Sequence, residues 1–345
     1  MKKFLGILVF ATILLFSCNS NKSVNLSGAG ATFPLPYYNM VFKTYRDSTN
    51  INVNYGGIGS GGGIRSLKEG IVDFAGSDAF ITDDEAKEMD ETIHIPTCLG
   101  AVVIAYNLPE VYDLKLTGDI IAEIFLGKIT SWDDKKIAEI NPDINLPNKP
   151  ITPVYRSDGS GTTFVFSDYL SKVHEEWNST IGFGKSISFP TGLGAKGNPG
   201  VAGTIGQTEG TIGYIGSEYA FAQNIPIAII QNSSGNFIKP SVESISASAE
   251  LDFPADSRAM ITNSPIENAY PISCLTWIII YKEQNYSKRT LEQAQETIAL
   301  LDYLLSDNAQ NQTIKVHYAP LPNNVINNAK NALKTVTYNG VNIVQ

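Results

Sequence analysis

Three short segments rich in Gly, Ser and Thr are the parts of this 345-residue sequence best suited to bind a ligand. They are GAGATF at 28–33, GIGSGGG at 57–63 and DGSGT at 158–162, and each opens into a stretch with the apolar spacing of an amphipathic helix. Small residues let a ligand approach the backbone, and the unpaired N–H groups at the start of a helix, with its dipole, attract anions. Together the segments predict a site for a small oxyanion, although each by itself also fits ordinary helix capping.

Two charged residues beside these segments could take part in such a site. Arg156 precedes the third segment and carries a planar set of donors that matches phosphate geometry; the alternative is a surface ion pair with Asp158. Asp78 ends the sequence AGSD after a strand-like stretch, and by itself it fits a helix cap or a surface residue.

A dinucleotide site competes with this interpretation. Gly57, Gly59 and Gly62 match GxGxxG, and Asp83 and Asp84 lie near the expected offset. However, the strand before Gly57 alternates polar and apolar residues, whereas a central parallel strand is continuously apolar. An exported protein also has little access to a nicotinamide cofactor, so we expect no cofactor.

Hydrolytic and metal chemistry fit the sequence poorly. Ser60 and Ser160 both lack the Gly two positions earlier that a nucleophile elbow requires. Cys98 and Cys274 form either one disulfide or two buried free thiols, and neither has the spacing of a metal ligand. The histidines are also far apart and predict no metal site: His94, His174 and His317.

The first residues have the pattern of an export signal. Lys2 and Lys3 precede an apolar run over residues 4–16, which is too short to span a bilayer comfortably. The run ends in LFSC at Cys18, which resembles the lipobox of bacterial lipoproteins. That resemblance implies a signal peptide at 1–17, lipidation of Cys18, a polar tether at 18–25 and an extracytoplasmic, membrane-anchored protein. The alternative is an ordinary cleaved signal followed by a coincidental cysteine.

Length and composition define the class of protein that must hold these residues. The chain is long enough for about two domains, and 43% hydrophobic with 17% charged residues is a globular composition. A formal net charge of −9 argues against nucleic acid as a partner, because phosphate-backbone binding needs a basic face.

Strand-like and helix-like stretches alternate along the chain, which predicts an α/β fold. We expect strands at residues 51–55, 101–106, 151–155 and 277–281, and helices around residues 38–45 and 166–173. Capping boxes at 82–85 and 290–293 mark two further helix starts. The near-continuous apolar runs 98–106 and 274–281 predict strands buried on both faces, where the chain leaves one lobe and later returns to it.

Read together, the segments closely resemble the phosphate-binding proteins of bacterial phosphate-specific ABC transporters. The similarity covers nearly the whole mature chain, and its motifs occur in the family's order: GAGATFP at 28–34, VNYGGIGS at 53–60, VDFAGSD at 72–78, LGKITSWDD at 126–134, RSDGSGT at 156–162, GLGAKGN at 192–198, PIS at 271–273 and YAPLP at 318–322.

The resemblance implies a fold, partners and a ligand set. The fold is the periplasmic-binding-protein type II architecture, with lobe I formed by residues 26–107 and 277–345, lobe II by 108–276, two hinge crossings and the ligand in the cleft. The implied partners are inorganic phosphate and an ABC permease with its cytoplasmic ATPase, and the protein is not an enzyme. The implied ligand residues are Thr32, Phe33 (through its backbone N–H), Ser60, Asp78, Arg156, Ser160, Gly161 and Thr162.

Two acids match the family and one loop departs from it. Asp158 matches the acid that orients the arginine, and Asp78 matches an acid that would accept a hydrogen bond from a protonated oxyanion, which favours phosphate over sulfate. Gly61 and Gly63 make the second loop richer in glycine than is usual in the family. An extracytoplasmic phosphatase on the same scaffold, or a receptor for another oxyanion, remains an alternative.

Overall fold

The computed structural model describes residues 24–344, so the predicted signal peptide and Cys18 lie outside the described residues. The first part of the chain forms β1 (Asn25–Gly30), α1 (Leu35–Thr49), β2 (Asn52–Gly57), α2 (Ser60–Lys68), β3 (Phe74–Ser77), α3 (Asp83–Ala86) and β4 (Thr92–Tyr106). The strand β1 begins at Asn25, the last residue of the predicted tether.

The middle of the chain supplies most of the shorter elements. These are β5 (Lys115–Leu116), α4 (Gly118–Phe125), α5 (Lys135–Ile140), β6 (Thr152–Arg156), α6 (Gly161–Val173), α7 (Glu175–Thr180), β7 (Leu193–Ala195), α8 (Gly197–Gln207), β8 (Thr211–Gly216), α9 (Ser217–Gln223), β9 (Ile229–Gln231), β10 (Phe237–Ile238) and α10 (Val242–Ala247). The last part forms β11 (Ser273–Tyr281), α11 (Leu291–Leu304), α12 (Asp307–Thr313), a 3₁₀ turn (Ile314–Val316), α13 (Asn323–Leu333), β12 (Thr337–Tyr338) and β13 (Val341–Asn342).

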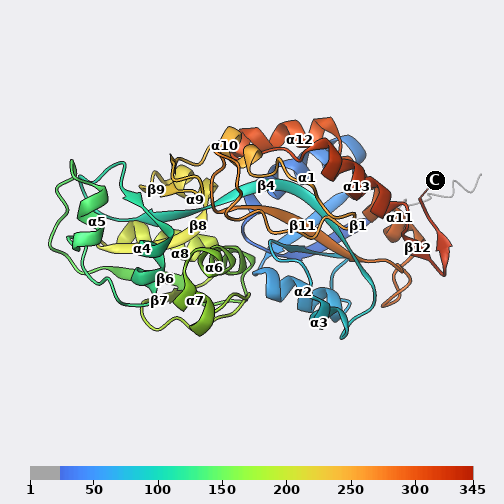
Figure 1. Ribbon diagram of the computed structural model, residues 1–345. Coiled ribbons are helices and arrows are strands. Elements are labelled where there is room, and N and C mark those ends of the chain that lie inside the picture. The colour runs from blue at the N-terminus through green and yellow to red at the C-terminus, as the bar shows by residue number, and fades with distance from the viewer. Residues whose placement is uncertain (1–23, 345) are drawn as a thin grey trace, which may run out of the picture.

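One long strand joins the two halves of the molecule. Residues 92–101 of β4 pair with β11, and residues 102–106 of the same strand pair with β8. A single eight-stranded sheet results, in the order β2-β1-β3-β11-β4-β8-β6-β7. Figure 1 shows β4 running from one half, with β1 and β11, into the other half, with β6 and β8. The strand is buried along nearly its whole length, as its apolar run predicts.

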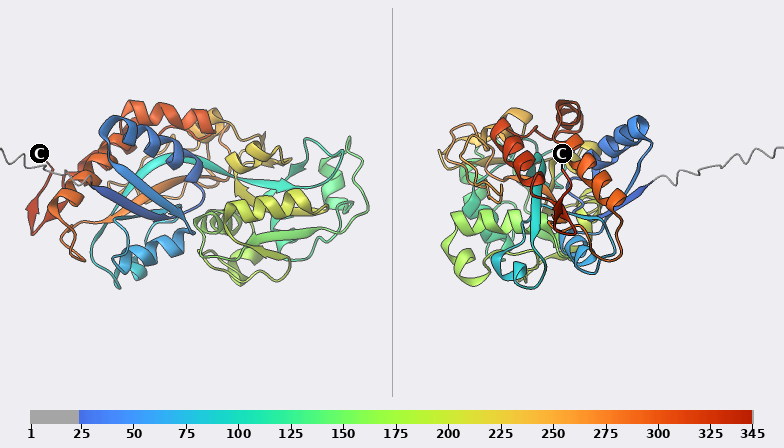
Figure 2. Two further views of the ribbon diagram at one scale, coloured as in Figure 1. Left: turned by 180° about the vertical axis from the view of Figure 1, so that it is seen from behind. Right: turned by 90° about the vertical axis from the view of Figure 1, so that its right-hand side faces the viewer.

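Helices cover both faces of the sheet. In the half that contains β1, helices α1, α12 and α13 lie on one side, and α2 and α3 on the other (Figures 1 and 2). This layering is the α/β arrangement predicted from the alternation of strands and helices. No helix in the range 24–344 combines the length and the apolar character that a membrane span requires.

Several local predictions are confirmed by the structure. The alternating strand before Gly57 is β2, which lies at the edge of the sheet, and both predicted capping boxes begin helices, α3 and α11. Gly63, which the sequence placed in the second loop, lies in the first turn of α2, where it allows a close approach because a Cβ there would lie 2.4 Å from the carbonyl oxygen of Ala29. The predicted lobe boundaries remain a prediction, with β4 ending at Tyr106 and β11 beginning at Ser273.

His94 is a buried histidine that helps to hold the loop after Asp78. Its Nε2 accepts a hydrogen bond of 3.0 Å from the backbone N–H of Ile81. Burial, aided by the positive charge of Arg258, lowers the pKa of His94 to about 3. Between pH values of about 3 and 6.5, the folded protein therefore keeps this imidazole neutral, whereas an unfolded chain would protonate it.

We expect the free energy of unfolding to decrease as the pH falls from neutrality towards the folded-state pKa of His94. Below the ordinary pKa of about 6.5, the unfolded chain takes up a proton that the folded protein refuses, at a cost of up to ~1.4 kcal/mol per pH unit. The variant His94→Gln keeps an acceptor but cannot titrate, so denaturant unfolding at several pH values should show a shallower slope. His317→Gln, at an exposed site, is the control; equal slopes for His94→Gln and wild type would contradict the prediction.

Candidate functional site

The helices α2 and α6 start at the same place, although about a hundred residues separate them in sequence. The hydroxyl of Ser60, the first residue of α2, accepts hydrogen bonds from the backbone N–H of Gly161, at 3.0 Å, and from that of Asp78, at 3.4 Å. Gly161 is the first residue of α6, and Ser160 caps that helix by accepting from the N–H of Thr163 at 3.0 Å. Two N-terminal helix ends therefore converge, and Ser160 caps α6 within one of the loops that the sequence predicts to bind an anion.

Asp78 lies between these two helix starts, fully buried. Its Oδ1 accepts a hydrogen bond of 2.8 Å from Thr276, but its Oδ2 has no hydrogen-bond partner among the described residues. A Cβ on Gly161 would lie only 2.7 Å from that Oδ2, so the free oxygen faces the start of α6. Burial raises the pKa of Asp78 to about 7, despite the hydrogen bond from Thr276 and the charge of Arg156.

Arg156 and Asp158 form a two-point ion pair at the start of the same helix. Arg156 donates from Nε and Nη2 to the two carboxylate oxygens of Asp158, at 2.8 and 2.6 Å, and from Nη1 to the hydroxyl of Thr162, at 3.2 Å. The Arg156 side chain is only 1% exposed. Burial opposes ionisation of Asp158, but the Arg156 hydrogen bonds outweigh it and lower the pKa of the carboxyl. The ion pair thus exists, and it is buried rather than at the surface.

Asn198 connects the first loop to the third. Its backbone N–H and its Nδ2 both donate to the hydroxyl of Thr32 at 3.0 Å, and Nδ2 also donates to Thr162 at 3.2 Å. The Phe33 side chain points away into the core, where it packs against Tyr318 with the ring centroids 5.8 Å apart. The hydrogen bonds therefore form two groups, one with Thr32, Thr162 and Arg156 and one with Ser60, Asp78 and Gly161. The groups meet at the adjacent residues 161 and 162, and only the backbone of Phe33 is available to a ligand.

The place where the starts of α2 and α6 meet Asp78 is called the junction below. Three residues at this junction were not singled out from the sequence. Thr276 holds Asp78, Asn198 holds Thr32, and Glu218 is a second buried carboxyl whose pKa burial raises to about 8, helped by the nearby charge of Asp78. Asn198 ends a motif that the family resemblance had marked, so a signal for it existed. Thr276 and Glu218 lie within buried stretches, and the apolar residues around them indicate a hydrophobic core and give no sign of a polar site.

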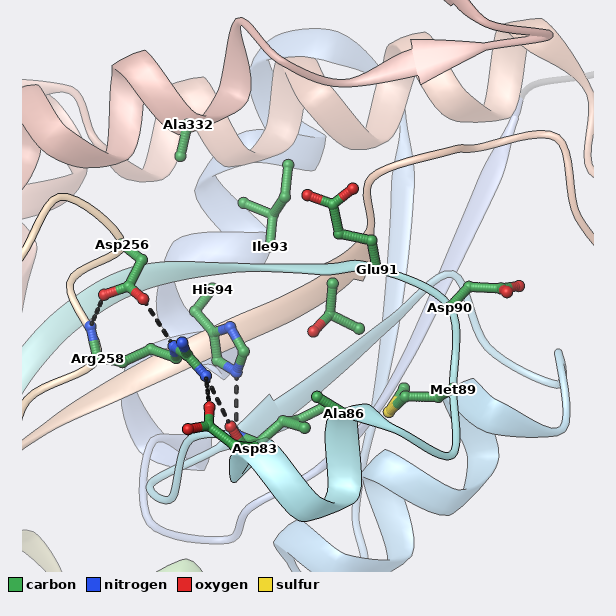
Figure 3. A pocket seen from close by; sticks show the side chains of 12 residues that line it. Asp83, Ala86, Met89, Asp90, Glu91, Ile93, His94, Asp256, Arg258 and Ala332 are labelled. Atoms are coloured by element: carbon green, nitrogen blue, oxygen red, sulfur yellow. Dashed lines mark hydrogen bonds and ion pairs between the residues drawn. The ribbon is translucent and has the colours of Figure 1, made fainter.

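Other groups with chemical potential lie apart from this junction. Cys98 and Cys274 are buried free thiols. Within residues 24–344, no three His, Cys, Asp or Glu side chains are gathered to hold a metal ion. A cavity of about 540 Å³ lies between α3 and the Asp256–Arg258 loop, and none of the candidate ligand residues lines it. Figure 3 shows the side chains that line it.

The close contact at Gly161 generates a first prediction for this site. The variant Gly161→Ala would place its Cβ 2.5 Å from the Ser60 hydroxyl and 2.7 Å from the Asp78 backbone nitrogen, so the two loops must separate. We expect a larger radius of gyration in small-angle X-ray scattering than for the wild type. Gly203→Ala in α8 is the matched control, because nothing lies within 4 Å of a Cβ there. An unchanged radius for Gly161→Ala would show that the contact is not tight.

Comparisons with known proteins agree on one family. The model of the PBP superfamily domain matches residues 19–308. A relative from Xylella fastidiosa (strain Temecula1), named phosphate-binding protein PstS, is 39% identical over 317 residues, covering 90% of this chain and 85% of its own. The relative of the same name from Haemophilus influenzae is 38% identical, covering 97% of this chain and 98% of its own.

Solved structures show the same fold at lower sequence identity. A high-affinity periplasmic phosphate-binding protein (PfluDING), solved with bound phosphate, has a TM-score of 0.71 at 21% identity and covers 89% of this chain and 93% of its own. An ABC-type phosphate transport receptor from Vibrio cholerae has a TM-score of 0.56 at 19% identity, over 86% of this chain and 100% of its own. These likenesses confirm the predicted periplasmic-binding-protein fold. The chain therefore belongs to the PstS family of phosphate-binding proteins, within the PBP superfamily.

Proposed function

We propose that this chain captures inorganic phosphate at the junction of α2, α6 and Asp78 and delivers it to an ABC permease. One observation carries the proposal: the buried Oδ2 of Asp78 has no partner among the described residues and faces the start of a helix. A ligand that accepts hydrogen bonds from the helix start, and donates one to Asp78, satisfies both sides. The names of the PstS relatives point to the same ligand.

The proposed ligand shell combines one cation with neutral donors. Arg156 supplies charge-assisted donors, and the candidate hydroxyl and backbone donors belong to Thr32, Phe33, Ser60, Ser160, Gly161 and Thr162. Asp158 is a positioning residue, since it holds the Arg156 guanidinium at two points. In the described structure Ser60 bonds directly to Gly161, so ligand entry requires some of these contacts to exchange.

Asp78 is the proposed selectivity element. An ionised carboxylate can only accept hydrogen bonds, and phosphate near neutral pH keeps at least one proton to donate, whereas sulfate keeps none. Sulfate would therefore place an unpaired charge against Asp78 in a buried site, which is costly.

The lobes and the anchor complete the proposal. Residues 26–107 with 277–345 and residues 108–276 act as two lobes that close on phosphate, and the closed shape is what the permease recognises. Lipidation at Cys18 would hold the receptor at an extracytoplasmic membrane surface. Binding proceeds without turnover, so the chain is a receptor and not an enzyme.

Calorimetric titration with phosphate and with sulfate tests the proposal. We expect one phosphate per chain for the wild type, and a phosphate-to-sulfate affinity ratio that falls at least ~tenfold in Asp78→Asn, since a hydrogen bond to a charged group contributes about 1.5–3 kcal/mol. Discrimination should also be weaker one unit below the Asp78 pKa than one unit above it, because the protonated carboxyl can donate to sulfate. Asp84→Asn changes an acid that is 91% exposed and is the control.

Two results would contradict this assignment. An unchanged affinity ratio in Asp78→Asn would remove Asp78 as the selectivity element. Incubation with a phosphate ester should give no product, because nothing is transformed in the proposed function; steady release of phosphate would instead support an extracytoplasmic phosphatase.

For the anchor, we expect Cys18→Ala to shift the expressed protein from the membrane fraction to the soluble fraction, since it loses its acyl chains. Immunoblotting of the two fractions measures the shift. Cys98→Ala, at a buried thiol, should stay with the membrane. If Cys18→Ala also stays there, the lipobox interpretation is wrong.

A further inference from the structure

Two ion pairs of the described chain join residues 108–276 to the remainder, and both end on α3. Lys185, in the loop before β7, contacts the Oε1 of Glu85 at 2.6 Å, and Arg258 contacts the Oδ1 of Asp83 at 3.5 Å. The helix α3 has only four residues, with a capping box at Thr82. Lys185 therefore reaches this small element of lobe I from lobe II, whereas the Arg258 loop itself also contacts lobe I, since Trp277 donates to the carbonyl oxygen of Ser257 and Asn328 to that of Pro254.

The Lys185–Glu85 pair links the two loops of the proposed phosphate site. The backbone carbonyl of Lys185 accepts the N–H of Ser160 at 2.8 Å, so this residue also supports the α6 loop. On the other side, the Oε2 of Glu85 accepts from the backbone N–H of Thr82 at 3.0 Å, four residues after Asp78. Each partner of the ion pair is thus fixed to a loop that carries a proposed ligand residue.

The pair is sheltered more than an ordinary surface ion pair. The Lys185 side chain is 15% exposed and that of Glu85 is 38% exposed, and the Lys185 ammonium lies 6.0 Å from the centroid of the Phe164 ring. Burial opposes ionisation of Glu85, but the hydrogen bonds from Lys185 and Thr82 outweigh it and lower its pKa. Screening by salt is weaker for such a pair than for exposed charges.

Arg258 makes the second connection to this part of lobe I. Figure 3 shows its side chain between Asp256 and Asp83, and its Nη1 also donates to the carbonyl oxygen of Ile81 at 3.1 Å. Asp83, however, is 92% exposed, so this ion pair contributes little by itself. The sheltered pair of Lys185 and Glu85 is therefore the stronger of the two.

We propose that Lys185 and Glu85 form a latch that exists only when the two lobes are closed and that slows the release of the bound ligand. Lys185 is a positioning residue in this proposal, since it touches the site only through Ser160 and α3. The latch stabilises the closed form relative to the open one, so it acts on the dissociation rate and leaves first encounter with the ligand almost unchanged. The inference rests on the proposed function, which identifies that ligand as phosphate.

The test measures phosphate release from the full chain, by dilution of the labelled complex into excess unlabelled phosphate. Lys185→Met keeps an apolar stem beside Phe164, and Glu85→Gln keeps an acceptor for Thr82. We expect each to raise the dissociation rate about two- to fivefold, and the double variant to be no faster than either single one. High salt should raise the wild-type rate towards that of Lys185→Met.

Lys68→Met is the matched control, because Lys68 pairs with Glu88 inside lobe I at 3.1 Å. Its dissociation rate should equal that of the wild type. Equal dissociation rates for wild type, Lys185→Met and Glu85→Gln would overturn the latch and leave phosphate binding intact. The latch would also be overturned if the double variant showed the sum of the two single effects on the dissociation rate.

A second readout does not depend on phosphate. Fluorophores on Glu139→Cys in α5 and Asp302→Cys in α11, both exposed positions, report the separation of the lobes by energy transfer in the free protein. Adding Lys185→Met or Glu85→Gln should lower the closed fraction. If the wild type fails to retain phosphate but this fraction still falls, the latch stands and the proposed function fails; an unchanged fraction in both variants overturns the latch.

Discussion

The meeting of a buried carboxyl with the start of a helix is the constraint on which the rest of this structure depends. Asp78 is fully buried with one oxygen unpartnered among the described residues, and the dipole of α6 points its positive end towards that oxygen. Such a carboxyl is costly to bury, so its surroundings must be fixed closely. Residue 161 has to be glycine because a Cβ would collide with Ser60 and Asp78, and Thr276 has to hold the other oxygen in place.

Charge at the junction is arranged locally and does not follow the net charge of the chain. The formal balance is −9, yet the junction combines one guanidinium, the carboxylate that orients it, the buried carboxyl of Asp78, and several neutral N–H and O–H groups. Exposed charges beyond about 8 Å are largely screened at physiological salt, so the oriented dipoles and Arg156 dominate there. The same principle makes a sheltered ion pair such as Lys185–Glu85 more effective than the exposed pairs elsewhere on the surface.

Much of the fold could be predicted from the sequence, because local patterns report local structure. The spacing of Tyr38, Val41 and Phe42 predicts α1, the capping residue Thr290 begins α11, and the alternation before Gly57 marks an edge strand. The three glycine-rich segments also predict helix starts where they occur. Thr276 and Glu218 could not be found this way, since each lies in a buried stretch whose pattern describes a core and carries no sign of a polar neighbour.

The amino-acid sequence alone was therefore enough to predict the class of fold and the positions of the glycine-rich helix starts. The order of its motifs was enough to predict the family. The sequence was not enough for the neighbours of Asp78, the burial that raises its pKa, or the contact of Lys185 with α3. Those properties depend on distances between segments that are about twenty to two hundred residues apart in the chain. Periodicity and capping are short-range effects. Desolvation and ion pairing arise only when the sheet, in which β4 is shared by both halves, brings distant segments together.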